Sequence, residues 1–172
     1  MKRSLGIINF LFLIFLFFSN PSLAGEFKVT RVYDGDTVKA EGHDIKINVR
    51  LVGIDAPETS RRKHEPGQPF SQQAKKHLAG LVLNKVVDIQ GYGMDRYSRI
   101  LGVLSLDGKN VNLEMVGVGL AEVYRGEHAP GFDPAPYQQA EKEARNARRG
   151  MWIQGDKYLS PREWRRMQRN GS

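Results

Sequence analysis

The order of strand-like and helix-like segments between residues 27 and 149 constrains the fold of this 172-residue chain most. Residues 45–51 alternate aliphatic with polar or charged side chains, so one face of a strand is apolar and Arg50 lies on the other face. Further short strands are expected at 85–90, at 100–106 and on both sides of the Asp34-Gly35 turn within 27–40. We therefore expect about five short strands.

Helical spacing of apolar residues appears at 71–83 and 111–120, between and after the later strands. A third helix is predicted over 133–149, with Asp133 as its N-cap, Pro134 at its first position and Gly150 as its stop. The strands and helices never settle into repeated β-α-β units. This order predicts an α+β fold, and a small barrel flanked by helices is the natural closure for so few strands.

The N-terminus has the features of a secretory signal peptide. Lys2 and Arg3 precede an apolar run over 5–18, and Ala24 ends a segment of small residues. The alternative is a membrane anchor, but the run falls short of the roughly 20 apolar residues that span a bilayer. We expect a signal peptide over 1–24 cleaved after about Ala24, a folded domain over 25–153, and a basic, fraying C-terminal tail over 154–172.

The chain contains no cysteine and carries a net charge of +7. The charge falls by two, to +5, when the segment that holds Lys2 and Arg3 is removed. An exported protein without disulfides suits the bacterial periplasm or the external medium. A moderate positive charge favours a polyanionic partner such as nucleic acid only weakly. We expect a monomer without stable membrane association after signal cleavage.

Two aspartates lie beside residues that bend the backbone, Asp36 after Gly35 and Asp55 before Pro57. Two carboxylates, a backbone carbonyl and waters are sufficient to hold a hard cation such as Ca²⁺. Zinc is not favoured, because the chain lacks cysteine and its histidines show no paired spacing. The alternative is that Asp34 and Asp36 only cap a turn, and for Asp34 this alternative stays open because one turn needs only one such side chain.

Glu58 and two arginines complete a set suited to phosphodiester chemistry. Glu58, three residues after Asp55, could accept a proton from an attacking water, although the alternative is an exposed loop acid. Arg50 and Arg99 offer permanently charged guanidinium groups that match a phosphate. Together these residues predict metal-assisted cleavage of a phosphodiester. Tyr97 and Tyr124 could stack on a base or bond a phosphate, or could belong to the core.

Three ordered motifs identify a known family. They are Asp34-Gly35-Asp36-Thr37-Val38-Lys39, Arg50-Leu51-Val52-Gly53-Ile54-Asp55-Ala56-Pro57-Glu58-Thr59 and Asp95-Arg96-Tyr97-Ser98-Arg99. With Val111-Asn112, Gly119-Leu120-Ala121 and Trp152, they resemble staphylococcal (micrococcal) nuclease and its thermonuclease relatives over residues 27–153.

The resemblance implies a five-stranded OB-fold barrel with three helices and calcium-dependent hydrolysis of DNA and RNA that leaves 3′-phosphate ends. It implies that Asp36, Asp55 and the carbonyl of Ala56 hold Ca²⁺. It further implies that Glu58 is the general base and that Arg50 and Arg99 stabilise the phosphorane. Arg96, Tyr97 and Tyr124 are the expected substrate contacts.

Two other functions are considered. The same barrel could bind nucleic acid without cleaving it, although retention of the whole charged set argues against this. The basic residues over 162–169 could instead serve a surface-anchored adhesin. Cleavage of DNA, as opposed to a gel shift alone, separates the first alternative from a nuclease, and recovery from washed membranes would favour the second.

Overall fold

The computed structural model describes residues 24–60 and 65–170. The predicted signal peptide over 1–24 therefore lies outside the described residues, apart from Ala24, which begins the first strand. Within the described ranges, no helix is both long enough and apolar enough to cross a membrane.

Five strands form a closed barrel in the order β3-β2-β1-β5-β6. Neighbours in this order are antiparallel, and a parallel pairing of β3 with β6 closes the barrel. The strands are β1 (Ala24–Val32), β2 (Thr37–Gly42), β3 (Ile45–Leu51), β5 (Val86–Met94) and β6 (Ile100–Leu106). The predicted α+β class and small barrel are thus confirmed.

Gly102 allows β6 to approach β3 closely at the closure. A Cβ atom at this position would lie 2.9 Å from Cγ1 of Val49 and 3.1 Å from Cγ2 of Ile89. Such contacts are tighter than ordinary van der Waals separation, so a side chain here would push the two strands apart. The closure places Arg50 of β3 opposite Leu101 of β6, two residues beyond Arg99.

Short strand pairs extend the barrel at two places. β4 (Ile54–Asp55) pairs with β8 (Glu122–Val123), which sets Asp55 opposite Glu122. β7 (Lys109–Asn110) pairs with the end of β6.

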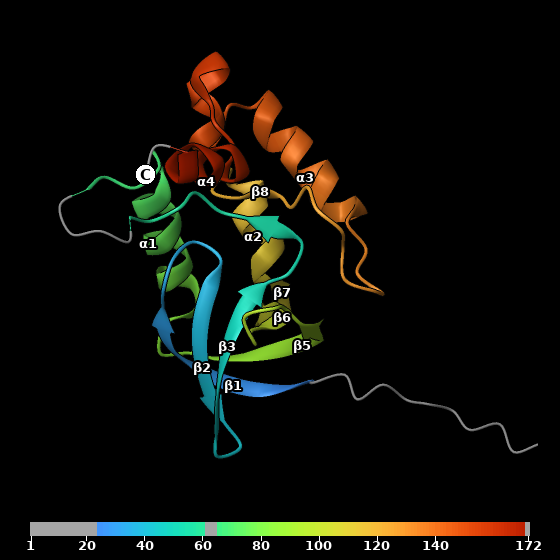
Figure 1. The fold of residues 1–172 in the computed structure, drawn as a ribbon. Coiled ribbons are helices and arrows are strands. Elements are labelled where there is room, and N and C mark those ends of the chain that lie inside the picture. Colours follow the sequence, from blue (N-terminus) through green and yellow to red (C-terminus); the bar gives the residue numbers. More distant parts are fainter. Residues whose placement is uncertain (1–23, 61–64, 171–172) are drawn as a thin grey trace, which may run out of the picture.

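The helices are α1 (Ser71–Val82), α2 (Val111–Gly117), α3 (Ala135–Asn146), the 3₁₀ helix η1 (Gly150–Lys157) and α4 (Pro161–Asn170). In Figure 1 the barrel strands occupy the lower half of the view, and α3 and α4 lie above them. The three predicted helices correspond to α1, α2 and α3. α3 begins at Ala135, with Pro134 rather than the predicted Asp133 at the N-cap position, and the Asp133 carboxylate accepts a hydrogen bond from the backbone N–H of Ala135 (2.9 Å).

The C-terminal segment expected to fray forms η1 and α4 instead. Ser160 and Glu163 make a capping box at the start of α4, with the Ser160 N–H donating to Glu163 Oε2 and the Glu163 N–H donating to Ser160 Oγ. Tyr158 packs on Trp152, with ring centroids 4.6 Å apart, and Pro161 is buried. The prediction of fraying was wrong because the basic composition obscured a helix cap and two packed residues of this segment, Tyr158 and Pro161.

Asn112 joins the barrel to α2 inside the core. Its side chain is fully buried, and its Nδ2 donates to the carbonyls of Val52 and Gly102, each at 3.0 Å. Its Oδ1 accepts from the backbone N–H of Leu104 at 3.1 Å. One side chain therefore fixes β6 and the turn that leads from β3 to β4, the strand that carries Asp55.

Candidate active site

Asp36 lies directly before β2 and Asp55 at the end of β4, and both are only 2% exposed. The backbone N–H of Ala56 donates to Asp36 Oδ2 at 2.7 Å, so the two segments that carry the aspartates are joined directly. The hydroxyl of Thr37 donates to Asp36 Oδ1 at 3.1 Å. These bonds fix the orientation of the Asp36 carboxylate, as a buried charge requires.

Arg50 bridges the two carboxylates. One terminal nitrogen pairs with Asp36 Oδ1, and the other donates to Asp55 Oδ1 at 2.7 Å. Strand alternation directs Arg50 away from the face that Val49 and Leu51 bury, as the sequence predicted. The guanidinium supplies the positive charge that lets two buried carboxylates lie side by side.

Glu58 lies on the loop that follows β4, with a half-buried side chain. Its backbone N–H donates to Gln68 Oε1 at 3.1 Å, and its carbonyl accepts from the Gln68 N–H at 2.8 Å. Gln68 is itself buried, so this double contact holds the loop against the start of α1. The carboxylate is thereby directed toward Asp55 and a guanidinium from α4.

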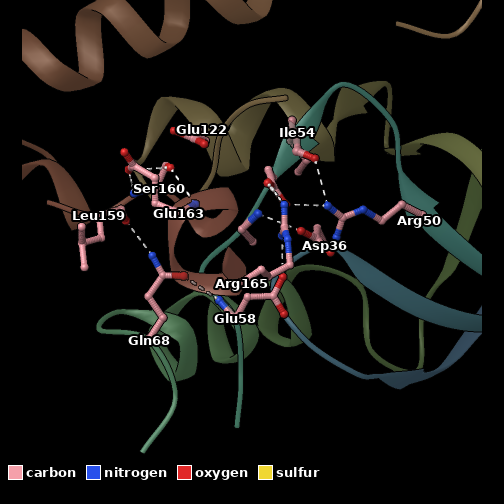
Figure 2. A network of polar contacts seen from close by, with 12 residues as sticks. Asp36, Arg50, Ile54, Glu58, Gln68, Glu122, Leu159, Ser160, Glu163 and Arg165 are labelled. Carbon is pink, nitrogen blue, oxygen red and sulfur yellow. Dashed lines mark hydrogen bonds and ion pairs between the residues drawn. The ribbon is translucent and has the colours of Figure 1, made fainter. Parts of the chain in front are cut away.

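That guanidinium belongs to Arg165, which Figure 2 shows beside Glu58 and the Asp36–Arg50 pair. Its two terminal nitrogens donate to the two oxygens of Asp55 at 3.0 and 2.7 Å. One of them also donates to Glu58 Oε1 at 2.5 Å. Hydrogen bonds to Asp55, together with its charge and that of Glu58, raise the pKa of Arg165 above its usual value.

Arg99 is held by an acid of its own turn rather than by the central carboxylates. Its Nε donates to Asp95 Oδ2 at 2.8 Å, and the Arg99 N–H donates to Asp95 Oδ1 at 3.0 Å. Although partial burial opposes them, these bonds hold the pKa of Asp95 below its usual value. Ser98 adopts a left-handed conformation with φ 58°, which turns the chain so that Arg99 faces Asp95.

Asp34 caps its own turn. Its Oδ1 accepts from the Asp36 N–H at 3.0 Å, the arrangement expected for a turn-forming aspartate. Burial raises the pKa of Asp34, whereas the charges of Arg50 and Arg99 lower it. Arg99 is therefore close enough for its charge to act on the edge of the site.

The aromatic residues predicted to contact substrate are accessible. Tyr97 is 64% exposed and Tyr124 is 39% exposed. The guanidinium carbons of Arg96 and Arg99 lie 4.9 and 5.5 Å from the centroid of the Tyr97 ring. Tyr124 directly follows β8, and its N–H donates to the carbonyl of Gly53 at 2.9 Å. Neither ring belongs to the core, so both remain candidates for stacking.

The donors at this site fit a hard cation. Among residues 24–60 and 65–170, no three His, Asp or Glu side chains group closely enough to hold a metal by themselves. Two buried carboxylates that share one guanidinium do lie together, with the Ala56 backbone beside them. Such an oxygen-only set, completed by a carbonyl and waters, suits Ca²⁺ better than a transition metal.

Comparison with known proteins agrees with this geometry. Residues 48–154 match the model of the family described as staphylococcal nuclease homologue. The chain belongs to the staphylococcal nuclease family. Its barrel is accordingly an OB-fold, as the motifs predicted, and the protein is a nuclease.

Relatives of this nuclease cover most of its length. A Haemophilus influenzae protein named "Uncharacterized endonuclease" is 38% identical over 83% of this chain and 74% of its own. An Escherichia coli protein of the same name is 35% identical over 89% and 94% of the two chains. A Shigella flexneri protein named "Micrococcal nuclease" is 36% identical over 84% and 83%.

Sequence reasoning missed three residues that the nuclease fold brings to the site. Arg165 and Gln68 contact Glu58, and Glu122 lies opposite Asp55. Arg165 is separated from Asp55 by 110 positions, so no local spacing links them. Glu122 had a weak signal, because it is a charged residue in an apolar stretch, Leu120 to Val123.

Glu122 is buried and titrates in the neutral range. Burial raises its pKa to about 7, although a hydrogen bond from the Tyr158 hydroxyl (2.8 Å) opposes the shift. The negative charge of Asp55 raises the pKa further. Glu122 therefore holds its proton to much higher pH in the folded nuclease than in the unfolded chain.

This shift predicts that Glu122 makes the metal-free nuclease less stable as pH rises from about 4.5 to 7. The sign follows because the folded protein retains a proton there that the unfolded chain releases. With about 1.4 kcal/mol per pKa unit, the loss reaches about 3 kcal/mol. Urea unfolding at pH 5 and pH 8 should show this loss reduced in Glu122→Gln, and unchanged in Glu143→Gln on the exposed side of α3. Equal pH dependence of Glu122→Gln and the wild type would contradict it.

Proposed function

We propose that this nuclease is an exported, calcium-dependent enzyme that hydrolyses phosphodiester bonds of DNA and RNA and leaves 3′-phosphate ends. The observation that carries the proposal is the bridge of Arg50 between Asp36 and Asp55, with Glu58 on the next loop. It joins the residues suited to a cation, a phosphate and a proton within one small region.

Asp36, Asp55 and the Ala56 carbonyl would hold the ion. The ion supplies positive charge that polarises the phosphate and favours deprotonation of water. The remaining chemistry belongs to the chain's own side chains. Glu58 accepts a proton from the water that attacks phosphorus, the bond from phosphorus to the 5′ oxygen breaks, and that oxygen leaves as a hydroxyl with a proton from the solvent, so that the phosphate stays on the 3′ side. Arg50 stabilises the extra negative charge on the phosphorane.

Arg99 has a second part in this proposal. Its ion pair with Asp95 keeps the guanidinium at the rim of the site, beside the exposed ring of Tyr97. A phosphate that carries more charge than the Asp95 carboxylate can recruit this guanidinium as the reaction proceeds. Tyr97 and Tyr124 offer aromatic faces for bases, which supports binding of single strands with little sequence preference.

The test is incubation of the purified protein, without residues 1–24, with DNA and with RNA. Each reaction is run with Ca²⁺ and with EDTA, and the fragment ends are examined. We expect both substrates to be shortened only with Ca²⁺, and DNA fragments that a polymerase extends only after phosphatase treatment. Undiminished cleavage in EDTA would refute the calcium dependence, and fragments extended without phosphatase would refute the 3′-phosphate product. A shifted but uncut substrate would favour the binding module.

Ca²⁺ is expected to raise the melting temperature of the wild-type protein, because an ion that binds only the folded state stabilises it. At 100 times the dissociation constant the gain is about 2.7 kcal/mol, which corresponds to several degrees for a domain of this size. Thermal melts with 10 mM Ca²⁺ and with EDTA measure it. Identical midpoints would contradict a calcium site.

Export is proposed from the N-terminal sequence alone. The charged start, short apolar run and small residues before Gly25 support a cleaved signal. Cell fractionation followed by N-terminal sequencing tests it, with a mature chain that begins near Gly25 expected in the periplasm or medium. A cytoplasmic protein that keeps its first residues would rule export out.

A further inference from the structure

Helix α4 delivers a positive charge to the two carboxylates that the proposed function needs free. Arg165 meets both oxygens of Asp55 at once, the fork geometry in which a guanidinium binds a carboxylate most strongly. The same side chain pairs with Glu58 Oε1. One residue therefore engages a proposed cation ligand and the proposed general base together.

The Arg165 guanidinium neutralises Asp55, as a bound cation would. The Asp55 carboxylate is 3% exposed, and its oxygens are shared between Arg50 and Arg165. A buried carboxylate requires such neutralisation when no ion is bound. An ion that takes the Asp55 oxygens must displace the Arg165 fork, because those oxygens cannot accept both at full strength.

Most of α4 is exposed to solvent, so the helix has few buried side chains to uncover if it moves away from the site. Pro161 is its buried residue, Trp164 and Arg165 are half-buried, and the other described positions of the helix are exposed. The segment just before the helix is anchored firmly, since Gln68 Nε2 donates to the Leu159 carbonyl at 2.7 Å and Tyr158 donates to Glu122. The helix is thus tethered at its start, one turn away from Arg165.

We infer that α4 is an autoinhibitory element in which Arg165 competes with the metal ion for Asp55 and restrains Glu58. The inference rests on the proposed function, since it presumes the cation. With the helix docked, Asp55 is neutralised and the Glu58 carboxylate is engaged. With the ion bound, the guanidinium leaves and Glu58 is free to accept a proton.

This competition has a measurable consequence. The apparent dissociation constant of the ion equals its intrinsic dissociation constant divided by the fraction of molecules whose α4 is undocked, so docking weakens ion binding. Removing the guanidinium should therefore tighten ion binding by more than the loss of one surface positive charge does. A structural role for Arg165 alone predicts the opposite, since loss of a stabilising contact loosens the site.

The experiment is calorimetric titration of Ca²⁺ into the wild type, Arg165→Gln, Arg165→Lys and the control Arg166→Gln. Arg166 is the exposed neighbour on the same helix, so its variant makes the same change in net charge. We expect Arg165→Gln to bind Ca²⁺ about tenfold more tightly or better, Arg165→Lys to lie between, and Arg166→Gln to match the wild type. Lysine is intermediate because it keeps the charge but lacks the fork.

Melting curves give a second readout on the same four proteins. Arg165→Gln should melt lower than the wild type in EDTA, because Asp55 and Glu58 lose a partner, and should gain more from Ca²⁺. The melting curve also shows whether Arg165→Gln is folded. If this variant lacks a cooperative transition, Arg165→Lys takes its place in the comparison with the wild type.

Two results would overturn the inference. If the wild type binds Ca²⁺ and Arg165→Gln binds it equally or more weakly, α4 is no competitor, while the proposed function stands. A lower kcat with unchanged Ca²⁺ affinity would likewise show that Arg165 acts on substrate. If none of the proteins binds Ca²⁺, the calcium-dependent function fails and the inference fails with it.

Discussion

Replacing Glu58 by glutamine is expected to lower kcat on DNA by about 10²- to 10⁴-fold, the usual contribution of a positioned general base. The amide keeps the shape of the side chain but accepts no proton. The backbone contacts with Gln68 are unaffected, so the loop stays in place. Initial rates at saturating Ca²⁺ and substrate measure the effect.

A matched variant separates the base from a general effect of charge. Glu114→Gln removes an exposed acid on α2 and should keep wild-type rates. A Glu58→Gln enzyme that retains more than about a third of wild-type kcat would exclude Glu58 as the base.

Asn112→Ala is expected to destabilise the protein by about 3–5 kcal/mol. The change strands the Val52 carbonyl and the Leu104 N–H and leaves a cavity, and each buried unsatisfied group costs about 1–3 kcal/mol. The Gly102 carbonyl is less affected, since it also accepts from the Val52 N–H at 2.9 Å. Urea denaturation measures the free energy of unfolding.

Asn48→Ala serves as the control for this loss. Asn48 is exposed on β3 and accepts a long hydrogen bond from the Tyr33 hydroxyl, at 3.3 Å. Its variant should lie within about 0.5 kcal/mol of the wild type. If Asn112→Ala were equally mild, the barrel and α2 would be held together by apolar packing alone.

Periodicity predicted β3 and β6 well because the side-chain pattern of each strand lies within its own residues. The alternation over 45–51 coincides with β3, and the apolar run over 100–106 coincides with β6. β5 extends beyond the predicted residue 90, because Gly91 and Gly93 interrupt the sequence pattern while the pairing with β6 continues to Met94 across a register shift between Gly91 and Met94. α3 ends at Asn146 rather than 149, since Arg148 adopts φ 51° before Gly150.

The site residues likewise divide into those that local motifs predicted and those that depend on distant contacts. Asp36, Arg50, Asp55 and Glu58 lie within 23 positions, and the structure brings them together as their motifs predicted. Arg99 reaches the rim of the site only because β3 pairs in parallel with β6. Among the sequence signals, only the family motif placed Arg99 at the site. The place of Arg165 at the site depends on how a basic helix packs against a distant loop, and amino-acid composition does not predict such packing.

The parallel closure of the barrel also governs when activity can appear during folding. It joins residues 49–51 to residues 100–102, about 50 positions further along the chain, whereas the hairpins and helices form from near neighbours. Contacts so far apart in sequence cost more loop entropy and form late. The strand ends that carry Arg50 and Arg99 are paired only after that step. Cleavage of nucleic acid is therefore expected to belong to the finished barrel, and a chain with native helices but an open barrel should be inert toward DNA and RNA.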